Sequence, residues 1–446
     1  MDDRVSTPRR RAGDYRRAVP RPGADSAVGR VLELTVGAPA HGGSCVARHG
    51  DLVVFVRHAL PGESVRVRVT EGCDGDRFWR ADAVEVLAAS PDRVVAPCRF
   101  AGPGACGGCD WQHASLPAQR RLKAQVLAEQ LHRLAELDLS PVVEPLPGAP
   151  DGSGWRTRVR FAVDPSGRPG LRRHRSHEVI PVTECFIAHP DVAATGVLDA
   201  RWADTAQVQV TIAGSGEHAV VVRAASNRRG VRSAPSATPM PAPAATVLAY
   251  SPPGVSATDR VVENVAGRIY AVPAGGFWQV HPYAAQTLVG AVAEALAPRP
   301  GDVLLDLYSG VGLFAGSLAA AVAPGGRVFA VESDAAAVAA ARDNLSGLPG
   351  VTVVADRVDQ ALAAGLPEAS LVVLDPPRVG AGREVVEAVA ARGPRRVAYV
   401  ACDPATLARD LRTFAECGYR VRALRAFDLF PHTHHLEAVA TLEPMF

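Results

Sequence analysis

Cys402 is the residue of this chain best placed for covalent chemistry. It stands at the tip of an expected β-strand, RRVAYVA (395–401), and it precedes a segment with proline in its first turn, which is typical of a helix start. A thiol just ahead of a helix N-terminus is expected to have its thiolate stabilised by the helix dipole, which makes it more nucleophilic. The alternative is a buried structural cysteine such as Cys417.

Glu437 is the second candidate for chemistry, because it lies in an otherwise apolar strand near the C-terminus. A carboxyl group in such surroundings should have a raised pKa and can serve as a base. Three histidines precede it, at His432, His434 and His435, and a metal site there is one interpretation. The intervening proline and threonine favour a shaped active-site loop instead.

A third group of residues indicates a cofactor site. The strand at residues 303–308 runs into a turn with two glycines, Gly310 and Gly312, where the backbone can approach a ligand at a helix N-terminus. Glu332 ends the next strand and could bind ribose hydroxyls, while Asp356 follows the third strand and could meet an adenine edge. There is no GxGxxG phosphate cradle, so the pattern favours a class I S-adenosylmethionine-dependent methyltransferase over a nicotinamide enzyme.

The fourth strand of this half leads into Asp375-Pro376-Pro377-Arg378. A rigid turn at the carboxyl end of a parallel strand lies where ligands bind in such sheets. Amino-group methyltransferases carry a similar Asp-Pro-Pro followed by an aromatic residue that stacks on the target base. Because Arg378 stands there, the sequence argues against methylation of an exocyclic amine.

Four of the eight cysteines form a candidate metal site, since Cys98, Cys106 and Cys109 follow a C-x7-C-x2-C pattern and Cys185 can supply a fourth thiolate. Disulfides are not expected in a cytosolic chain, and close spacing suggests metal. Four thiolates suit either zinc or a [4Fe–4S] cluster.

The elements that position these residues indicate several domains in a chain of 446 residues, 48% of them hydrophobic and 21% charged. We expect a disordered basic tail at 1–25, a barrel of about five short strands at 26–90, a central domain at 91–262 and alternating strands and helices at 263–446. The central domain should contain a helix at 116–136 and a flexible Pro-rich loop at 231–259. Without an apolar run of membrane-spanning length or a signal peptide, we expect a cytoplasmic protein with no membrane partner.

An RNA-binding surface is predicted in the central domain. Residues 155–161, WRTRVRF, alternate three arginines with aromatic residues, and the basic run 172–175 follows. Arginines on one face of a strand, together with stacking rings, suit single-stranded or looped RNA, and a solvated strand face is the alternative. Arginine number itself carries little weight, because 47 of the 48 basic residues are Arg, with Lys123 the exception, and base composition explains this.

Several long motifs in order resemble the RNA uracil-C5 methyltransferase family. They are GGFWQVHP (275–282), DLYSGVGLF, DPPRVG, ACDPATLARDL and DLFPHTHHLE. The likeness runs from about residue 28 to the end, and the N-terminal barrel resembles the TRAM domain of ribosomal RNA members of the family. Two small departures are Ser309 and His281, which stand where many members have Cys and Asn.

The resemblance assigns roles to the candidate residues. It implies that the Cys402 thiolate adds to C6 of uracil and that Glu437 removes the C5 proton. It also implies S-adenosyl-L-methionine as methyl donor and RNA as partner, with Arg378 and Arg409 holding phosphate or the uracil carbonyls. The residues that match the family's cofactor contacts are Gln279, Tyr308, Glu332 and Asp375, to which we add Asp356.

The expected fold class is therefore α/β, with a Rossmann-like class I methyltransferase domain, an OB-like TRAM barrel and an inserted α+β iron–sulfur domain. The resemblance favours a [4Fe–4S] cluster over zinc, although the family's usual first spacing is C-x5-C and this chain has two residues more. We expect this cluster to be structural, ordering a domain that contacts RNA.

The expected substrate is a uridine in 23S ribosomal RNA, because barrel and cluster occur together in that branch of the family. A transfer RNA uridine is the alternative substrate, and a non-catalytic RNA-binding protein is the alternative of a different class. DNA cytosine methylation is disfavoured, since Ala401 rather than proline precedes Cys402. We expect a monomer with no DNA partner.

Overall fold

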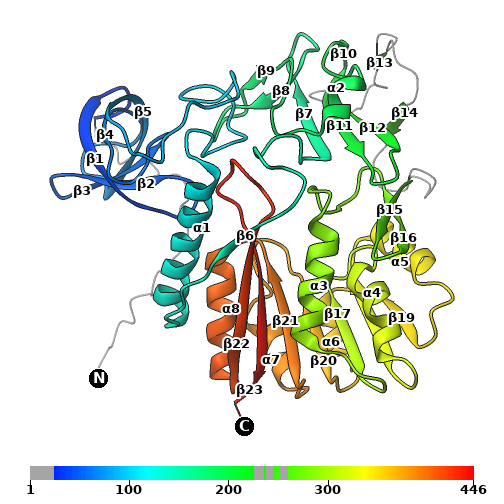
Figure 1. Ribbon diagram of the computed structural model, residues 1–446. Helices are drawn as coiled ribbons and strands as arrows, with labels where there is room; N and C mark the ends of the chain where they lie inside the picture. The colour runs from blue at the N-terminus through cyan, green and yellow to red at the C-terminus, as the bar shows by residue number, and fades with distance from the viewer. Residues whose placement is uncertain (1–24, 226–235, 238–244, 251–259, 446) are drawn as a thin grey trace, which may run out of the picture.

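The computed structural model describes residues 25–225, 236–237, 245–250 and 260–445. Figure 1 shows a small barrel and a central sheet at one end of the molecule and a larger sheet flanked by helices at the other. None of the helices in these ranges is long and apolar enough to cross a membrane.

The N-terminal barrel is a closed five-stranded sheet in the order β1-β2-β3-β5-β4, as the sequence predicted. On β4 the alternating residues Val65, Val67 and Val69 are buried in the barrel, while the arginines between them face outward. Because the barrel is closed, it has no free sheet edge whose backbone groups would need another strand to pair with. Its strands are β1 (Val31–Pro39), β2 (Cys45–His49), β3 (Leu52–Arg57), β4 (Ser64–Glu71) and β5 (Phe78–Ala88).

The central part is a six-stranded sheet in the order β14-β12-β11-β7-β8-β9. Its strands are β7 (Arg158–Val163), β8 (Pro169–Arg172), β9 (Val179–Pro181), β11 (Thr205–Ile212), β12 (His218–Ala224) and β14 (Ala245–Tyr250), and it also carries α2 (Pro190–Ala194) and the short pair β10 (Trp202–Ala203) and β13 (Ser236–Ala237).

Strand β14 falls within the stretch 231–259 that the sequence predicted as a flexible loop, and that prediction is wrong for Ala245–Tyr250. The six prolines that motivated it all lie outside β14, which pairs in parallel with β12. Apart from Ser236–Ala237, the rest of the predicted loop lies outside the described residues.

The C-terminal part is an eight-stranded sheet in the order β19-β18-β17-β20-β21-β23-β22-β6. The first five strands are parallel and β23 inserts antiparallel to β21, which confirms the Rossmann-like prediction. The strands are β17 (Val303–Leu307), β18 (Arg327–Glu332), β19 (Val351–Ala355), β20 (Leu371–Leu374), β21 (Arg396–Ala401), β22 (Tyr419–Asp428) and β23 (Glu437–Pro444), with β6 (Val143–Pro145) at the edge.

Six helices flank this sheet: α3 (Ala284–Leu296), α4 (Leu313–Val322), α5 (Ala335–Asn344), α6 (Val358–Ala363), α7 (Arg383–Ala390) and α8 (Pro404–Glu416). The carboxyl ends of the parallel strands meet at one edge, which faces the barrel and the central sheet (Figure 1). Residues that follow those strands are thereby collected between the parts of the molecule.

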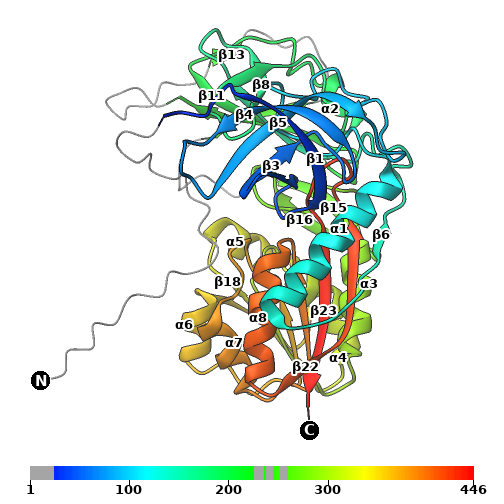
Figure 2. The same cartoon turned by 90° about the vertical axis from the view of Figure 1, so that its left-hand side faces the viewer.

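The segment that connects the barrel to the central sheet packs against the C-terminal sheet and its helices. Helix α1 (Leu116–Gln130), continued by a π-helical turn η1 (Leu131–Ala135), lies beside α8 in Figures 1 and 2, and β6 pairs with β22. The hairpin of β15 (Arg260–Val265) and β16 (Arg268–Pro273) spans the boundary expected at residue 262. Sequence order therefore does not separate the two parts cleanly.

Lys123, the chain's only lysine, fixes α1 to the C-terminal loop. Its buried ammonium donates to Asp428 Oδ1 at 2.5 Å and to the Phe430 carbonyl at 3.0 Å. Burial lowers the pKa of Lys123, while the Asp428 carboxylate opposes that shift. A buried charge of this kind needs its partner, so α1 and the loop that begins at Asp428 are held together.

Candidate active site

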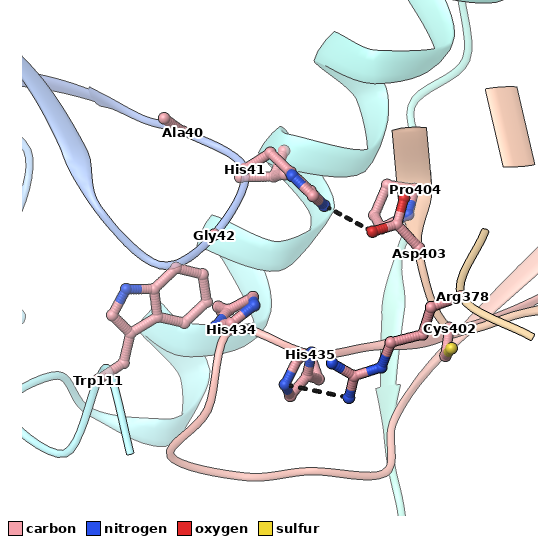
Figure 3. A pocket seen from close by; sticks show the side chains of 11 residues that line it. Ala40, His41, Gly42, Trp111, Arg378, Cys402, Asp403, Pro404, His434 and His435 are labelled. Carbon is pink, nitrogen blue, oxygen red and sulfur yellow. Dashed lines mark hydrogen bonds and ion pairs between the residues drawn. The ribbon is translucent and has the colours of Figure 1, made fainter. Parts of the chain in front are cut away.

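A cavity of about 190 Å³ beside Cys402 is lined by the β1–β2 loop of the barrel, by Trp111 and α1, and by loops of the C-terminal part. Figure 3 shows residues of the β1–β2 loop on one side and the loop before β23 on the other. The lining residues are Ala40, His41, Gly42, Trp111, Val126, Arg378, Cys402, Asp403, Pro404, His434 and His435. We call this cavity the nucleophile pocket.

The turn that carries Cys402 is fixed by its neighbour Asp403. The Asp403 side chain is the N-cap of α8, accepting hydrogen bonds from Ala405 N at 3.0 Å and Thr406 N at 2.9 Å. Its other oxygen lies 3.0 Å from His41 Nε2, and Figure 3 shows His41 pointing from the barrel loop to this carboxylate. The barrel thus contacts the residue next to the candidate nucleophile.

Cys402 is partly buried, and its electrostatic setting differs from the one predicted. The pKa of the Cys402 thiol is raised to about 12, mainly by burial, with Glu437, Asp375 and Asp403 contributing to the shift and Arg378 opposing it. Desolvation and three carboxyl groups disfavour the thiolate form of Cys402, and they oppose the stabilisation expected from the helix dipole.

We expect the alkylation rate of Cys402 to rise about tenfold for each pH unit between about pH 7 and about pH 10, because only the thiolate reacts and its fraction grows with pH below the pKa. Timed iodoacetamide labelling with peptide mass spectrometry measures this rate. A rate that levels off below about pH 9 would show that the free protein already holds a thiolate. Labelling of a Cys402→Ser variant gives the background from the other cysteines.

Glu437 begins β23 and is buried, opposite Phe427 in the sheet. Burial raises the pKa of its carboxyl well above the usual value, Asp375 adds to the shift, and Arg378 opposes it. Desolvation likewise raises the pKa of Asp375 to about 7, with Asp306 adding to it. Cys402, Glu437 and Asp375 therefore influence one another's protonation, and Arg378 is the cation beside both Cys402 and Glu437.

The three histidines before β23 have separate partners. His434 Nδ1 lies 2.6 Å from Asp110 Oδ2, and His435 Nε2 lies 3.4 Å from a guanidinium nitrogen of Arg378. His432 contacts Gln119 and the Asp151 carbonyl. Within the described ranges no group of three or more His, Cys, Asp or Glu side chains is arranged to hold a metal ion. The histidine segment is instead a loop held in place by hydrogen bonds with Asp110, Gln119 and Asp151, which lie between the barrel and the central sheet.

A second cavity, of about 550 Å³, lies at the carboxyl ends of β17, β18 and β20, and we call it the cofactor pocket. Tyr308 and Glu332 both line it, as do Val331, Ser333, Arg357, Val358, Asp359, Pro377, Val379, Gly380, Ala381, Gly382, Arg383, Glu384 and Val385. Its volume is in the range of small-molecule sites.

Glu332 organises the glycine turn beside this pocket. Its carboxylate accepts from Gly310 N at 2.9 Å and from Ser333 N and Asp334 N at 2.7 Å. Tyr308 has a positive φ of 67°, an uncommon conformation for a residue with a side chain. Such strain is found at ligand-binding turns, where the surrounding structure holds it in place.

The other predicted cofactor residues, Gln279, Asp356 and Asp375, do not line this pocket. Asp375 follows β20 and is half-buried, and Asp356 donates its backbone N–H to the Glu332 carbonyl at 3.0 Å. Gln279 is buried and belongs to neither lining, and Arg409 is exposed on α8 away from both. In the turn after β20 the neighbouring residues Pro377 and Arg378 line different pockets, Pro377 the cofactor pocket and Arg378 the nucleophile pocket.

The four cysteines of the predicted metal site lie close enough to interact electrostatically. Burial raises the pKa of Cys106 to about 11, and Cys185 and Cys98 add to the shift. Burial also raises the pKa of Cys109, again with a contribution from Cys185. The described part of the chain contains no arrangement of three or more metal-binding side chains, so a bound cluster is not shown.

The RNA surface predicted at residues 155–161 is wrong for its aromatic residues. Trp155 and Phe161 are buried, and Arg158 is also buried, donating to carbonyls of the turn after β16, among them Gly276 O at 3.1 Å. Strand β7 lies inside the sheet between β11 and β8, so its apolar side chains enter the core. Of the three arginines, Arg160 alone is exposed.

Sequence reasoning missed His41 and Trp111 as pocket residues. Each lies in a glycine-containing loop far from Cys402 along the chain, and no periodicity marks them. The signal that existed was the Ala-His-Gly-Gly turn between two barrel strands: Gly43 has a positive φ, and a Cβ there would lie 2.8 Å from Asp110 Cγ. This loop is built to pack closely against the central part.

Comparison with known proteins gives two family matches. Residues 366–444 match the family described as tRNA (Uracil-5-)-methyltransferase, and residues 25–78 match the TRAM domain. The first match contains Cys402 and Glu437, and the second covers most of the barrel.

Whole-chain relatives agree with these matches. An RNA methyltransferase of Streptomyces avermitilis, itself uncharacterized, is 50% identical, with 94% of this chain and 99% of the relative covered. The 23S rRNA (uracil(1939)-C(5))-methyltransferase of Alkalilimnicola ehrlichii is 32% identical, with 92% and 96% covered. In fold, the chain is similar to the crystal structure of Pyrococcus abyssi tRNA (uracil-54, C5)-methyltransferase in complex with S-adenosyl-L-homocysteine, with TM-score 0.67, 21% identity and 92% and 100% covered. The chain belongs to the RNA uracil-C5 methyltransferase family.

Proposed function

We propose that this enzyme transfers a methyl group from S-adenosylmethionine to C5 of a uridine in RNA, with Cys402 as covalent nucleophile and Glu437 as base. The observation that carries the proposal is the pair of pockets lined by adjacent residues of the turn after β20. One contains the candidate nucleophile, and the other has the size and the acidic strand tip of a cofactor site.

The chemistry needs a nucleophile because C5 of uracil is a poor carbon nucleophile by itself. When the Cys402 thiolate adds to C6, the electron pair of the C5–C6 bond moves onto O4, and C5 can then take a methyl group. Bound S-adenosylmethionine would supply that group from its sulfonium. Glu437 then removes the C5 proton, and elimination restores the C5–C6 double bond and releases the thiolate.

The surroundings of Cys402 and Glu437 suit this cycle. Arg378 lines the nucleophile pocket and favours the charged forms of both residues, offsetting their burial. A carboxyl group with a raised pKa is a strong base once ionised. A uridine must leave its stack to enter a pocket of this kind, and Arg378 can meet its carbonyls or phosphate.

For the methyl donor we propose Tyr308 and Glu332 as direct contacts, with Glu332 at the position where such folds bind ribose hydroxyls. Gln279, Asp356 and Asp375 remain proposed contacts, supported by the resemblance of their motifs. The likeness in fold to an enzyme crystallised with S-adenosyl-L-homocysteine agrees with this assignment.

The proposed substrate is a uridine of 23S ribosomal RNA, methylated in the cytoplasm. Support comes from the relative named for that RNA and from the TRAM match. Transfer RNA is the second candidate, because the family match and the similar crystal structure carry transfer RNA names. Transfer of tritiated methyl groups to separate 23S and transfer RNA transcripts, with mapping of 5-methyluridine, decides between them. Absence of transfer to either RNA would refute the proposed function.

We also propose that Cys98, Cys106, Cys109 and Cys185 hold a [4Fe–4S] cluster, with zinc as the alternative. Burial and the neighbouring thiols disfavour the thiolate form of Cys106 and Cys109, and a bound metal ion would offset this. The loop is tight: Gly107 donates to the Arg172 carbonyl at 3.0 Å, and a Cβ on Gly107 would lie 2.5 Å from His174 N.

Replacing Cys109 by serine should remove most of the iron and acid-labile sulfide from anaerobically purified protein, because a cluster with four cysteine ligands loses one of them. Iron, sulfide and zinc assays with visible absorption spectra measure the change. Cys417→Ser, at the far end of α8, is the matched control and should keep the wild-type metal content. Wild-type protein that holds zinc without sulfide would contradict the cluster and support the alternative.

A further inference from the structure

Asp410 lies on α8, two turns beyond Cys402, and is buried. Its Oδ2 accepts a hydrogen bond from the Tyr399 hydroxyl at 2.5 Å and from the backbone N–H groups of Ala381 and Gly382 at 2.8 and 3.3 Å. The Tyr399 oxygen in turn accepts from Ala381 N at 3.1 Å. A single carboxylate oxygen on α8 therefore bonds both to Tyr399 of β21 and to the loop that contains Ala381 and Gly382.

That loop, residues 377–382, is shared by the two pockets. Arg378 lines the nucleophile pocket, whereas Pro377 and Val379 to Gly382 form a wall of the cofactor pocket. A shift of the loop would therefore change the position of Arg378 and the shape of the cofactor pocket together.

The fit between Asp410 and the loop is close. Gly380 has a positive φ of 84°, and a Cβ built on it would lie 2.7 Å from Asp410 Oδ2. A side chain at this position would displace the carboxylate, so glycine is required both by the conformation and by the contact. Tyr399 remains a hydrogen-bond donor, since burial and the Asp410 charge raise the pKa of its hydroxyl.

We propose that Asp410 is a positioning residue that sets the distance between the nucleophile and the methyl donor. The same helix begins at the Asp403 cap beside Cys402, so Asp410 ties the loop of the cofactor pocket to the element that carries the nucleophile. Hydrogen bonds to a buried carboxylate are the stronger kind, which suits them to hold a loop against thermal displacement. The expected effect of Asp410 on methyl transfer rests on the proposed function. Its expected effect on the binding of S-adenosylhomocysteine does not.

Four variants test the proposal. Asp410→Ala removes every bond to the loop, Asp410→Asn keeps a neutral acceptor of the same shape, and Tyr399→Phe removes only the hydroxyl. Thr413→Val is the matched control, because Thr413 is buried on the same helix and its hydroxyl bonds only the Arg409 carbonyl. Measurements are the Kd for S-adenosylhomocysteine by calorimetry, kcat and KM for methyl transfer, and the melting temperature.

We expect Asp410→Ala to weaken S-adenosylhomocysteine binding about tenfold to a hundredfold and to lower kcat as well, as loss of charge-assisted hydrogen bonds would. Asp410→Asn should fall between alanine and wild type, Tyr399→Phe should show a smaller loss, and Thr413→Val should match wild type. The proposal is overturned if folded Asp410→Ala binds and turns over like wild type, or if its losses only follow its unfolded fraction. If wild-type protein transfers no methyl group, the proposed function fails, and the binding series still decides whether Asp410 shapes the cofactor pocket.

Discussion

Replacing Cys402 by alanine is expected to abolish methyl transfer to RNA, with a loss of at least about ten-thousandfold, because Cys402 is the one thiol among the residues that line the nucleophile pocket. Without that addition C5 stays unreactive, however well the methyl donor is bound. Tritiated methyl transfer under single-turnover conditions measures the loss. The same protein should still bind S-adenosylhomocysteine, since Cys402 does not line the cofactor pocket.

Cys417→Ala is the matched control for this change, because Cys417 lies at the opposite end of α8 from Cys402. It should retain wild-type transfer. If Cys402→Ala retained more than a few per cent of the activity, Cys402 would not be the covalent nucleophile.

Replacing Glu437 by glutamine should slow turnover by about a hundredfold to ten-thousandfold, the range for loss of a general base. The defect should appear after the methyl group has been transferred. Because the C5 proton then stays in place, elimination cannot occur and the protein remains attached to methylated RNA. Denaturing electrophoresis with labelled RNA should therefore show a covalent complex that accumulates in the variant and stays scarce in wild type.

Glu443→Gln provides the control on the same strand, since Glu443 pairs with surface arginines and lies far from the pocket along β23. It should turn over normally without accumulating complex. A Glu437→Gln variant that forms no complex and transfers no methyl group would place Glu437 before methyl transfer and contradict its role as the base.

The C-terminal fold could be predicted from sequence because its signals are local. Short, mainly apolar runs indicated the parallel strands, and the residues at or just after their ends, such as Glu332, Asp375 and Cys402, had to gather at one sheet edge. Alternation on β4 likewise gave the barrel. In both cases the spacing of apolar residues and the positions where strands end can be read from the local sequence, without knowledge of distant segments.

The remaining features depend on contacts between distant segments. Strand β6 pairs with β22 across some 280 residues, and His41 reaches Asp403 from the barrel, neither of which leaves a periodic signal. The position of Cys402 before a helix is visible in the sequence, whereas its burial beside Glu437, which opposes the thiolate, is not. The aromatic residues Trp155 and Phe161 were expected at the surface because alternation of arginine and apolar residues looks the same in a surface strand and in a strand inside a sheet.

Mass spectrometry of the protein after incubation with S-adenosylmethionine and RNA containing 5-fluorouridine shows whether Cys402 forms the covalent bond to the RNA. Fluorine at C5 cannot leave as a proton, so the covalent intermediate should persist. We predict a stable complex in which a peptide containing Cys402 carries a nucleotide with one added methyl group. A complex attached at another residue, or ordinary RNA methylated at C5 with no trapped complex in the fluorinated RNA, would contradict it.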